Sequence, residues 1–475
     1  MRNYTLDENR HVEDRMTELI VTIGCAAGFA RDRTDSAEAL IETLAEAPGP
    51  RFLVFETLAE RTLAQAQVAK REDPTAGYSP AFEALLRPVI GSCKTHGIRI
   101  IGNFGAANPA AAARLAKQWA TEAGYPDLKV AYVTGDDLVG RISIETLRSS
   151  EIQGTLLHDT REVTAVNAYL GAEPVAAALD EGADIVITGR IADPVLALAP
   201  LIHSFGWASE DWDSLACGVL AGHLLECGAQ VTGGYYADPG VKDVPELDRV
   251  GYPIAEVSMT GEIIISKAGG TGGRVDLKTV TEQILYEIHD PAAYMTPDVT
   301  LDMTAIELEQ VAPDRVRVSG ARGHPRPETL KATVCIEGGY LAEAEISYAG
   351  PNAEARARLA ADIVRKRMLR QAPGLMLHVD IIGLVSVFAG SAFSLLDMPQ
   401  SPGVESLDLR LRVAAVTEDR SWGERLLNEV EALYCAGPAG GGGVRTHLTR
   451  RFKSASCLVP RHVIQTAYHF CEEVA

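Results

Sequence analysis

One short segment joins three reactive side-chain types at a spacing that suits proton transfer. Within Gly222–Gln230, His223 is followed by Glu226 and Cys227. On a helix these residues are three and four positions apart, so their side chains share one face. A histidine beside a carboxylate can transfer protons, and a cysteine beside a histidine can act as a nucleophile. We predict a catalytic His223–Glu226 pair. The alternative is a buried helix end, with Cys227 as a small apolar side chain.

A glycine-rich loop with a cation at each end lies further along the chain. It follows the strand-like run Glu262–Ile265 and precedes Val275–Ile288, whose apolar residues have helical spacing. Glycine lets a backbone approach a ligand closely, and free amides at a helix start can bind an anion. The predicted anion site comprises Lys267, Gly269, Gly270, Thr271, Gly272, Gly273 and Arg274. The alternative is a tight turn that joins a strand to a helix.

A second glycine-rich loop, Gly437–Arg445, contains four consecutive glycines. A glycine cap after a helix over residues 420–434 explains part of it. The alternative is a second anion site made by Gly440, Gly441, Gly442 and Arg445. Neither loop has the spacing of a nucleotide-binding P-loop or of a dinucleotide fingerprint.

The first half of the chain alternates strands with helices. Ala106–Ala123 and Pro174–Glu181 predict helices between strands, and this alternation predicts a parallel sheet with helices on its faces. We expect an α/β domain over residues 1–250 and favour an open sheet over a barrel. The predicted strands are Leu19–Ile23, Phe52–Phe55, Ile98–Ile101, Val130–Val133, Thr164–Val166 and Asp184–Ile187.

Polar residues follow these strands, where parallel sheets bind their ligands. Because these strand ends meet at one edge, we expect a shared polar site, with Asn103 and Arg190 binding substrate. Asp136 and Asp137 could form a second acid–base group or bind Mg²⁺. The residues concerned are Gly24-Cys25, Glu56-Thr57, Asn103, Gly135-Asp136-Asp137, Asn167 and Gly189-Arg190.

The pattern changes after about residue 250, where strands occur in pairs followed by helices. This order predicts an α+β domain over residues 251–475. Glu337–Tyr340 contains two glycines and predicts a hairpin turn between Leu330–Ile336 and Leu341–Tyr348. Further strands are expected at Val316–Ser319, His378–Leu384 and Leu407–Val416, and helices at Asn352–Leu369 and Ser421–Tyr434.

Composition limits the classes of partner. The chain has 475 residues and a net charge of −20, which argues against nucleic acid and anionic membranes. Eight scattered cysteines without a CxxC pair predict reduced thiols and no zinc site, and the charged N-terminus does not resemble a signal peptide. We therefore expect a cytoplasmic protein. The apolar stretch Ile381–Leu396 predicts a homo-oligomer with this stretch near the contact, the alternative being a core strand and buried loop.

Several motifs together resemble the acyclic terpene utilisation (AtuA-like) family, over nearly the whole chain. The resemblance implies a role in the breakdown of acyclic terpenes through acyl-CoA intermediates, as a lyase or hydratase. It assigns no residue a mechanism. The motifs are Gly135-Asp136-Asp137, Thr188–Pro194, Gly222–Gly228, Gly270–Gly273, Tyr286–Pro291 with Tyr294–Val299, and Gly437–Gly443.

Our leading hypothesis is an enzyme that acts on a carboxylate or its CoA thioester, by C–C cleavage or by adding or removing water. Both reactions need a base and donors that stabilise an enolate-like anion. CoA would enter as part of the substrate, and Mg²⁺ at Asp136 or Asp137 is the other cofactor that the sequence allows. The rival hypothesis is a non-catalytic subunit that binds an acyl-CoA or polycarboxylate and needs a small partner chain for activity.

Overall fold

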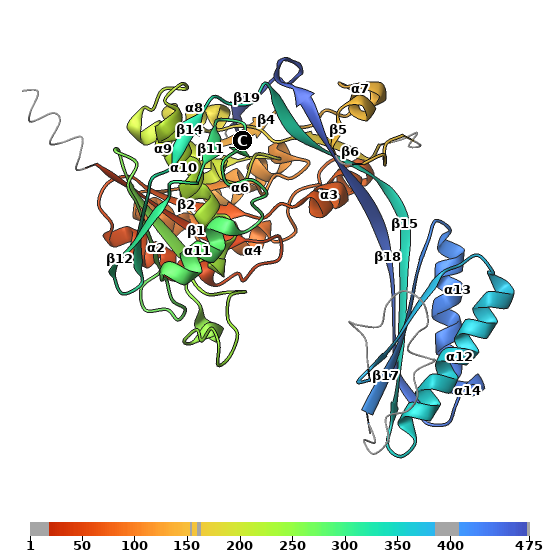
Figure 1. Cartoon of the computed structure of the whole chain (residues 1–475). Coiled ribbons are helices and arrows are strands. Elements are labelled where there is room, and N and C mark those ends of the chain that lie inside the picture. Colours follow the sequence, from red (N-terminus) through yellow and green to blue (C-terminus); the bar gives the residue numbers. More distant parts are fainter. Residues whose placement is uncertain (1–18, 153, 159–162, 385–407, 473–475) are drawn as a thin grey trace, which may run out of the picture. The chain divides into compact units, whose positions relative to one another are not determined.

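The computed structural model describes residues 19–152, 154–158, 163–384 and 408–472. The chain forms two compact units (Figure 1). Unit 1 contains Met1–Cys335 with Ser454–Ala475, and unit 2 contains Ile336–Lys453. Each unit has a sheet and a core of its own.

Unit 1 is built around an open mixed sheet of ten strands. Five of them pair in parallel in the order β1 (Ile20–Gly28), β2 (Arg51–Glu56), β3 (Ile98–Gly102), β7 (Ile185–Ile187) and β4 (Val130–Thr134). This arrangement confirms the prediction of an open α/β sheet rather than a barrel.

Helices cover both faces of the parallel strands. On one face, α2 (Ser36–Glu46) and α6 (Pro109–Glu122) share a core with Leu53 and Phe55 of β2. The opposite face of β2 carries Phe52, whose ring packs edge-on against His203 of α9 (Val195–Phe205). Since both faces are buried, the central strands have the nearly continuous apolar sequences typical of parallel sheets.

Antiparallel strands extend this sheet on both sides. β8 (Pro253–Ser258) pairs with β1, followed by β9 (Ile263–Lys267), β13 (Arg315–Ser319) and β12 (Glu307–Ala312), while β19 (Ala467–Phe470) pairs with β4. The change of pattern near residue 250 thus marks a change from parallel to antiparallel pairing. Unit 1 continues through this point to Cys335.

Two details of the predicted strands are wrong. β6 (Ala165–Ala168) lies outside the parallel sheet. It pairs antiparallel with β15 (Thr329–Ala349), a strand that is distant from it in sequence. β1 continues to Gly28, so Gly24 and Cys25 lie inside the strand rather than at its end. The polar edge at β1 therefore begins after Gly28.

The predicted hairpin at Glu337–Tyr340 is also wrong, because β15 runs through it as one strand. Gly339 has a φ of +71°, and a Cβ there would lie 2.3 Å from the carbonyl oxygen of Thr417. From Tyr340 onward, β15 pairs with β17 (Asp408–Thr417). The glycine therefore permits a close approach between two strands instead of a chain reversal.

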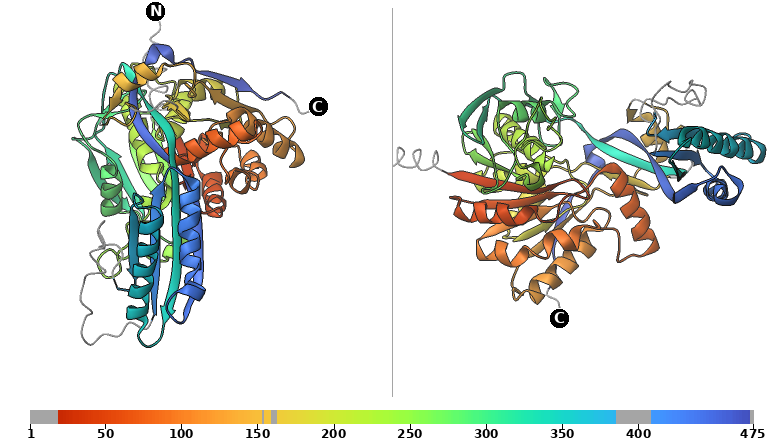
Figure 2. Two further views of the ribbon diagram at one scale, coloured as in Figure 1. Left: turned by 90° about the vertical axis from the view of Figure 1, so that its right-hand side faces the viewer. Right: turned by 90° about the horizontal axis from the view of Figure 1, so that it is seen from below.

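Unit 2 is an antiparallel sheet covered by helices. β16 (Leu377–Ile382) pairs with β17, which pairs with β15, followed by β18 (Gly441–Pro460). The helices α12 (Ala353–Gln371) and α13 (Arg420–Glu431) lie side by side and share a core with Ala344 and Leu411 (Figure 2). This part agrees with the predicted α+β order.

Among the described residues, no helix is long and apolar enough to cross a membrane. Most of the stretch Ile381–Leu396, including Val385 and Phe388, lies outside the described residues. The oligomer contact assigned to it stays a prediction.

Candidate active site

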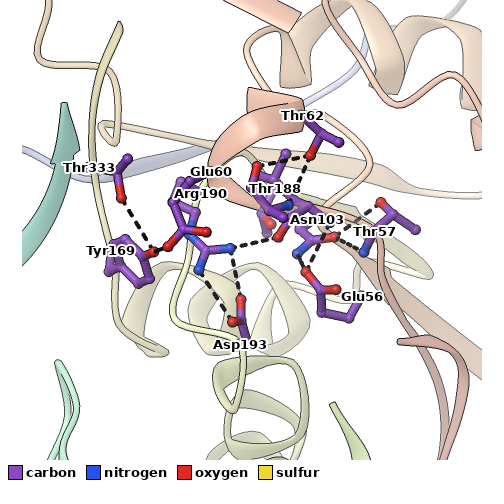
Figure 3. Close-up of polar contacts among 12 residues, drawn as sticks. Glu56, Thr57, Glu60, Thr62, Asn103, Tyr169, Thr188, Arg190, Asp193 and Thr333 are labelled. Atoms are coloured by element: carbon purple, nitrogen blue, oxygen red, sulfur yellow. Dashed lines mark hydrogen bonds and ion pairs between the residues drawn. The ribbon is translucent and has the colours of Figure 1, made fainter. Parts of the chain in front are cut away.

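Buried polar side chains meet where the parallel strands end (Figure 3). Glu56, the last residue of β2, is only 8% exposed. Its Oε1 accepts hydrogen bonds from the amide of Leu58 at 2.9 Å and from Asn103 Nδ2 at 2.8 Å. Asn103 Oδ1 in turn accepts from the amide of Thr57 at 2.7 Å. These hydrogen bonds connect the carboxyl ends of β2 and β3, as we expected for strand ends that meet at one edge of the sheet.

Burial, followed by the charge of Asp193, raises the pKa of Glu56 to about 8. Asp193 lies in the turn after β7, in the motif Thr188–Pro194. At neutral pH Glu56 is therefore mostly a neutral carboxylic acid. A buried acid that keeps its proton can donate it to a reacting group.

Arg190 is a buried cation whose terminal nitrogens contact the protein, while its Nε has no hydrogen-bond partner among the described residues. It forms an ion pair with Asp193 at 2.8 Å and donates to the carbonyl oxygen of Leu58 at 2.9 Å. Its guanidinium lies 3.9 Å from the ring centroid of Tyr169. Arg190 and Asn103, predicted to bind substrate, thus both contact the protein extensively. Their observed contacts position Glu56 and Asp193.

Glu60 begins α3 (Glu60–Glu72) and shows the opposite behaviour from Glu56. Its Oε1 accepts the hydroxyl hydrogen of Tyr169 at 2.6 Å and lies 3.5 Å from Lys331 Nζ. Burial alone would raise the pKa of Glu60, but the bond from Tyr169 and the charge of Arg190 lower it to about 2. Two glutamates four positions apart therefore hold different protonation states.

Asp136 and Asp137 follow β4 and bond to different partners, Asn167 and Gln67, which are themselves hydrogen-bonded to each other. Asp136 Oδ2 accepts from the amide of Arg190 at 2.9 Å and from Asn167 Nδ2 at 2.8 Å, and burial raises its pKa to about 6. Asp137 accepts from Gln67 Nε2 at 3.2 Å. Within the described residues, no cluster of three or more His, Cys, Asp or Glu side chains could hold a metal ion.

The segment with His223 and Glu226 is a helix end, as predicted. α10 (Trp212–Leu225) is capped at its N-terminus by Asp211, whose carboxylate accepts from the amide of Ser214 at 3.4 Å. A Cβ at Gly222 would lie 2.3 Å from the carbonyl oxygen of Pro194. Only a glycine lets α10 come this close to the turn after β7.

A second glycine contact fixes the same helix end to β1. A Cβ at Gly28, the last residue of β1, would lie 2.1 Å from the amide nitrogen of Gly228. The residues just after α10 therefore touch the carboxyl end of β1. Together, Gly28 and Gly222 place the helix end against two ends of the parallel strands.

His223 and Glu226 form a buried pair. His223 Nδ1 lies 3.0 Å from Glu226 Oε1, and His223 Nε2 donates to the carbonyl oxygen of Ile284 at 3.3 Å. The carbonyl can only accept, so Nε2 carries hydrogen, and Nδ1 and Oε1 share one further proton. This geometry agrees with the predicted acid–base pair, whose catalytic role stays a prediction.

Both pKa values of this pair are raised. Burial alone would lower the pKa of His223, but the hydrogen bond and charge of Glu226 raise it. Burial raises the pKa of Glu226 to about 7 against the opposing effect of His223, and the charge of Asp193 adds to the rise. Asp193 thus acts electrostatically on both Glu226 and Glu56. The second oxygen of Glu226, Oε2, is buried and has no hydrogen-bond partner within the part of the chain that the structure describes.

The thiol of Cys227 is a poor nucleophile in this setting. Burial and the charge of Glu226 both raise its pKa, so the thiolate is disfavoured. This agrees with the interpretation of Cys227 as a small apolar side chain.

The loop Lys267–Arg274 joins β9 to α11 (Leu277–Leu285), but most of its amides are already bonded. A Cβ at Gly272 would lie 2.1 Å from the carbonyl oxygen of Glu246, so packing also requires this glycine. The predicted anion site can therefore draw on the loop amides of Gly270 and Thr271. The bonded amides are those of Ala268, Gly269, Gly272, Gly273 and Arg274.

The cations of this loop also have partners. Lys267 Nζ donates to the carbonyl oxygen of Thr271 at 2.8 Å, and Arg274 pairs with Asp276. A pocket of about 450 Å³ beside the loop is lined by more carboxylates than cations: Glu46, Glu256 and Asp314 against Lys267 and Arg315. Anion binding at this loop stays a prediction, and the charges of the pocket do not favour it.

The second glycine loop belongs to unit 2 and leads into β18. Gly440 has a φ of +73°, and Gly441 and Gly442 already lie in the strand. Arg356 Nη1 donates to the carbonyl oxygen of Ala439 at 2.8 Å, while Arg445 is exposed on β18. These contacts give the loop a structural role, and its anion site stays a prediction.

Several residues of the cluster were not among the predicted site residues. They are Asp193 and Tyr294, which lie in motifs that carry the family resemblance, and Glu60 and Tyr169. Glu56 was expected at the polar edge because it directly follows a buried strand, but no catalytic role was predicted for it. Nothing in the sequence indicates the burial that sets its pKa, because that depends on packing.

These features define a mixed α/β protein with a buried cluster of titratable side chains at the carboxyl ends of its parallel strands. Residues 21–470 match the model of the acyclic terpene utilisation family protein AtuA. The chain therefore belongs to the acyclic terpene utilisation family, as its motifs predicted. No curated protein matches its sequence.

Proposed function

We propose that this protein is an enzyme of acyclic terpene breakdown that transfers a proton at the carbon next to a carboxylate or CoA thioester carbonyl. Proton transfer at this carbon is the step that C–C cleavage and the addition or removal of water have in common. The family assignment supports the pathway. The His223–Glu226 pair supports the chemistry.

The observation that carries the proposal is the state of Glu226. Its Oε1 is held by His223, and its Oε2 has no hydrogen-bond partner among the described residues. Its pKa of about 7 lets it both accept and release a proton near neutral pH. A catalytic base works best when its pKa lies near the working pH. Glu226 Oε2 would accept the substrate proton while His223 holds the carboxylate in place.

Glu56 supplies the complementary acid. Because its pKa is about 8, it is protonated when Glu226 is already partly ionised. Two carboxyl groups whose pKa values differ in this order can serve as base and acid in one reaction. Glu56 would protonate the leaving hydroxyl or the departing carbon.

The test is hydrogen exchange in D2O, which detects proton transfer without knowledge of the complete reaction. Branched acyl-CoA thioesters and the matching free acids are incubated with the protein, and deuterium at the α-carbon is measured by mass spectrometry. His223→Gln and Glu226→Gln should each slow exchange by about 10²-fold to 10⁴-fold.

The matched control is His203→Gln. His203 also faces a carboxylate, with Nδ1 lying 2.5 Å from Asp180 Oδ1, but it lies on α9 in a surface pair. This variant should exchange at the wild-type rate. If no thioester or acid exchanges with the wild-type protein, or if the Glu226 variant exchanges normally, the proposal is wrong.

A further inference from the structure

Tyr294 lies directly on the acid–base pair. It belongs to β10 (Tyr294–Met295), and its ring centroid is 5.6 Å from that of His223. β10 pairs with β11 (Thr300–Asp302), where Tyr294 is opposite the fully buried Leu301. The intervening turn is closed by Thr296, whose hydroxyl donates to the carbonyl oxygen of Val299 at 2.7 Å. The tyrosine is therefore held by a short, bonded turn.

The hydroxyl of Tyr294 has no hydrogen-bond partner among the described residues. Other tyrosines of unit 1 do have one, such as Tyr169, which donates to Glu60, and Tyr252, which donates to Asp32. A tyrosine hydroxyl that is free of protein partners and lies beside a proton-transferring pair is a hydrogen-bond donor available to a ligand.

The charges around this hydroxyl keep it protonated. Burial, and then the charges of Glu226 and Asp193, raise the pKa of Tyr294 well above its ordinary value. The phenol therefore acts as a hydrogen-bond donor and not as an acid that gives its proton away. Such a fixed neutral donor can stabilise an oxyanion as it develops.

Resting on the proposed function, we propose that Tyr294 is a catalytic residue that donates a hydrogen bond to the carbonyl oxygen of a thioester substrate. Glu226 Oε2 takes the proton from the adjacent carbon, and the C–H bonding electrons form the C=C bond of the enolate. The carbonyl π electrons move onto oxygen, where the Tyr294 hydroxyl binds them. Tyr294 keeps its own proton throughout.

The charge of the site selects a thioester over a free carboxylate. Glu226 and Asp193 are both acidic, and their cationic partners His223 and Arg190 are already engaged with them. Enolisation next to a free carboxylate would place a second negative charge on the substrate in this acidic surrounding. A thioester carbonyl is neutral and gains only one charge.

The test applies the same deuterium exchange to a thioester and to its free acid. Binding is measured separately for a ketone analogue of the thioester and for a CoA thioether that lacks the carbonyl oxygen. Tyr294→Phe should lower the maximal exchange rate on the thioester by about 10²-fold to 10³-fold, with a small change in KM. Wild-type protein should bind a ketone analogue more tightly than the thioether. This preference should be lost in Tyr294→Phe, because only the hydroxyl recognises the oxygen.

The matched control is Tyr348→Phe in unit 2, whose buried hydroxyl likewise has no hydrogen-bond partner among the described residues. It should leave exchange unchanged. If Tyr294→Phe does not fold, difluorotyrosine at position 294 replaces it, since it keeps the ring and strengthens the donor. A packing role would leave the exchange rate of that protein unchanged and would overturn the proposal.

The outcomes separate this proposal from the proposed function. Normal exchange by Tyr294→Phe, together with loss of exchange by His223→Gln, would overturn only the role of Tyr294. Equal exchange of the free acid and the thioester would overturn the substrate class. Normal exchange by both variants would overturn the proposed function as well.

Discussion

Replacement of Glu56 by glutamine should make the folded protein more stable at alkaline pH while it removes the proposed proton donor. Glutamine has nearly the shape of a protonated glutamate, and its carbonyl oxygen can accept the same bonds from Leu58 and Asn103. It cannot ionise. The wild-type side chain, by contrast, must be ionised at high pH in a buried position.

The size of the effect follows from the pKa of Glu56, which rises from 4.5 to about 8 on folding. Because the folded pKa is raised, the unfolded chain releases this proton first as the pH increases above 4.5. Wild-type stability is therefore lost as the pH rises toward the folded value. At pH 8 this loss amounts to about three pH units, and at about 1.4 kcal/mol per unit the variant should be more stable than wild type by on the order of 4 kcal/mol.

The assay is urea denaturation of both proteins between pH 5 and pH 9. The two stabilities should be similar near pH 5 and should separate steadily up to pH 8. Glu60→Gln is the matched control with the opposite sign, because the pKa of Glu60 is lowered to about 2 and its stabilisation is present above 4.5. That variant should be less stable at neutral pH. A constant difference between wild type and Glu56→Gln at all pH values would refute the reasoning.

Three further predictions follow from the same geometry. The rate of α-carbon exchange should rise through about pH 7, as Glu226 ionises, and fall above about pH 8, as Glu56 loses its proton; a pH-independent rate would contradict both roles. Gly28→Ala places a Cβ 2.1 Å from a backbone nitrogen, so it should lower the free energy of unfolding by about 1–3 kcal/mol and remove most of the activity. In the control Gly374→Ala the new Cβ meets no described atom within 4 Å, so stability and activity should not change. Light scattering at micromolar concentration should show a homo-oligomer, and a monomeric mass would refute the contact assigned to residues 381–396.

The family and the α/β class could both be predicted from the sequence, because each depends on patterns of residues that are close together in the chain. Buried parallel strands leave apolar runs such as Phe52–Phe55 and Ile98–Ile101, which became β2 and β3. The pair His223–Glu226 was also predictable, because two residues three apart on a helix are neighbours whatever surrounds the helix. The hydrogen bond of 3.0 Å between them agrees with that local rule.

The sequence did not reveal where a glycine packs against a distant segment of the chain. The glycines of Glu337–Tyr340 suggested a hairpin, but Gly339 instead accommodates Thr417 of another strand. Gly272 was assigned to an anion-binding loop, which stays a prediction, and its contact with Glu246 was not foreseen. A sequence shows that a glycine is present and does not show which segment of the chain approaches it.

The sequence by itself determined the elements, the family and the identities of the titratable residues. Only the tertiary structure decided which of these residues are buried together and which protons they keep. Glu56 and Glu60 have the same side chain four positions apart, yet one has a pKa of about 8 and the other of about 2. Their partners Asp193, Arg190 and Tyr169 come from distant segments, and the free energy of a buried charge depends on those partners rather than on its neighbours in sequence.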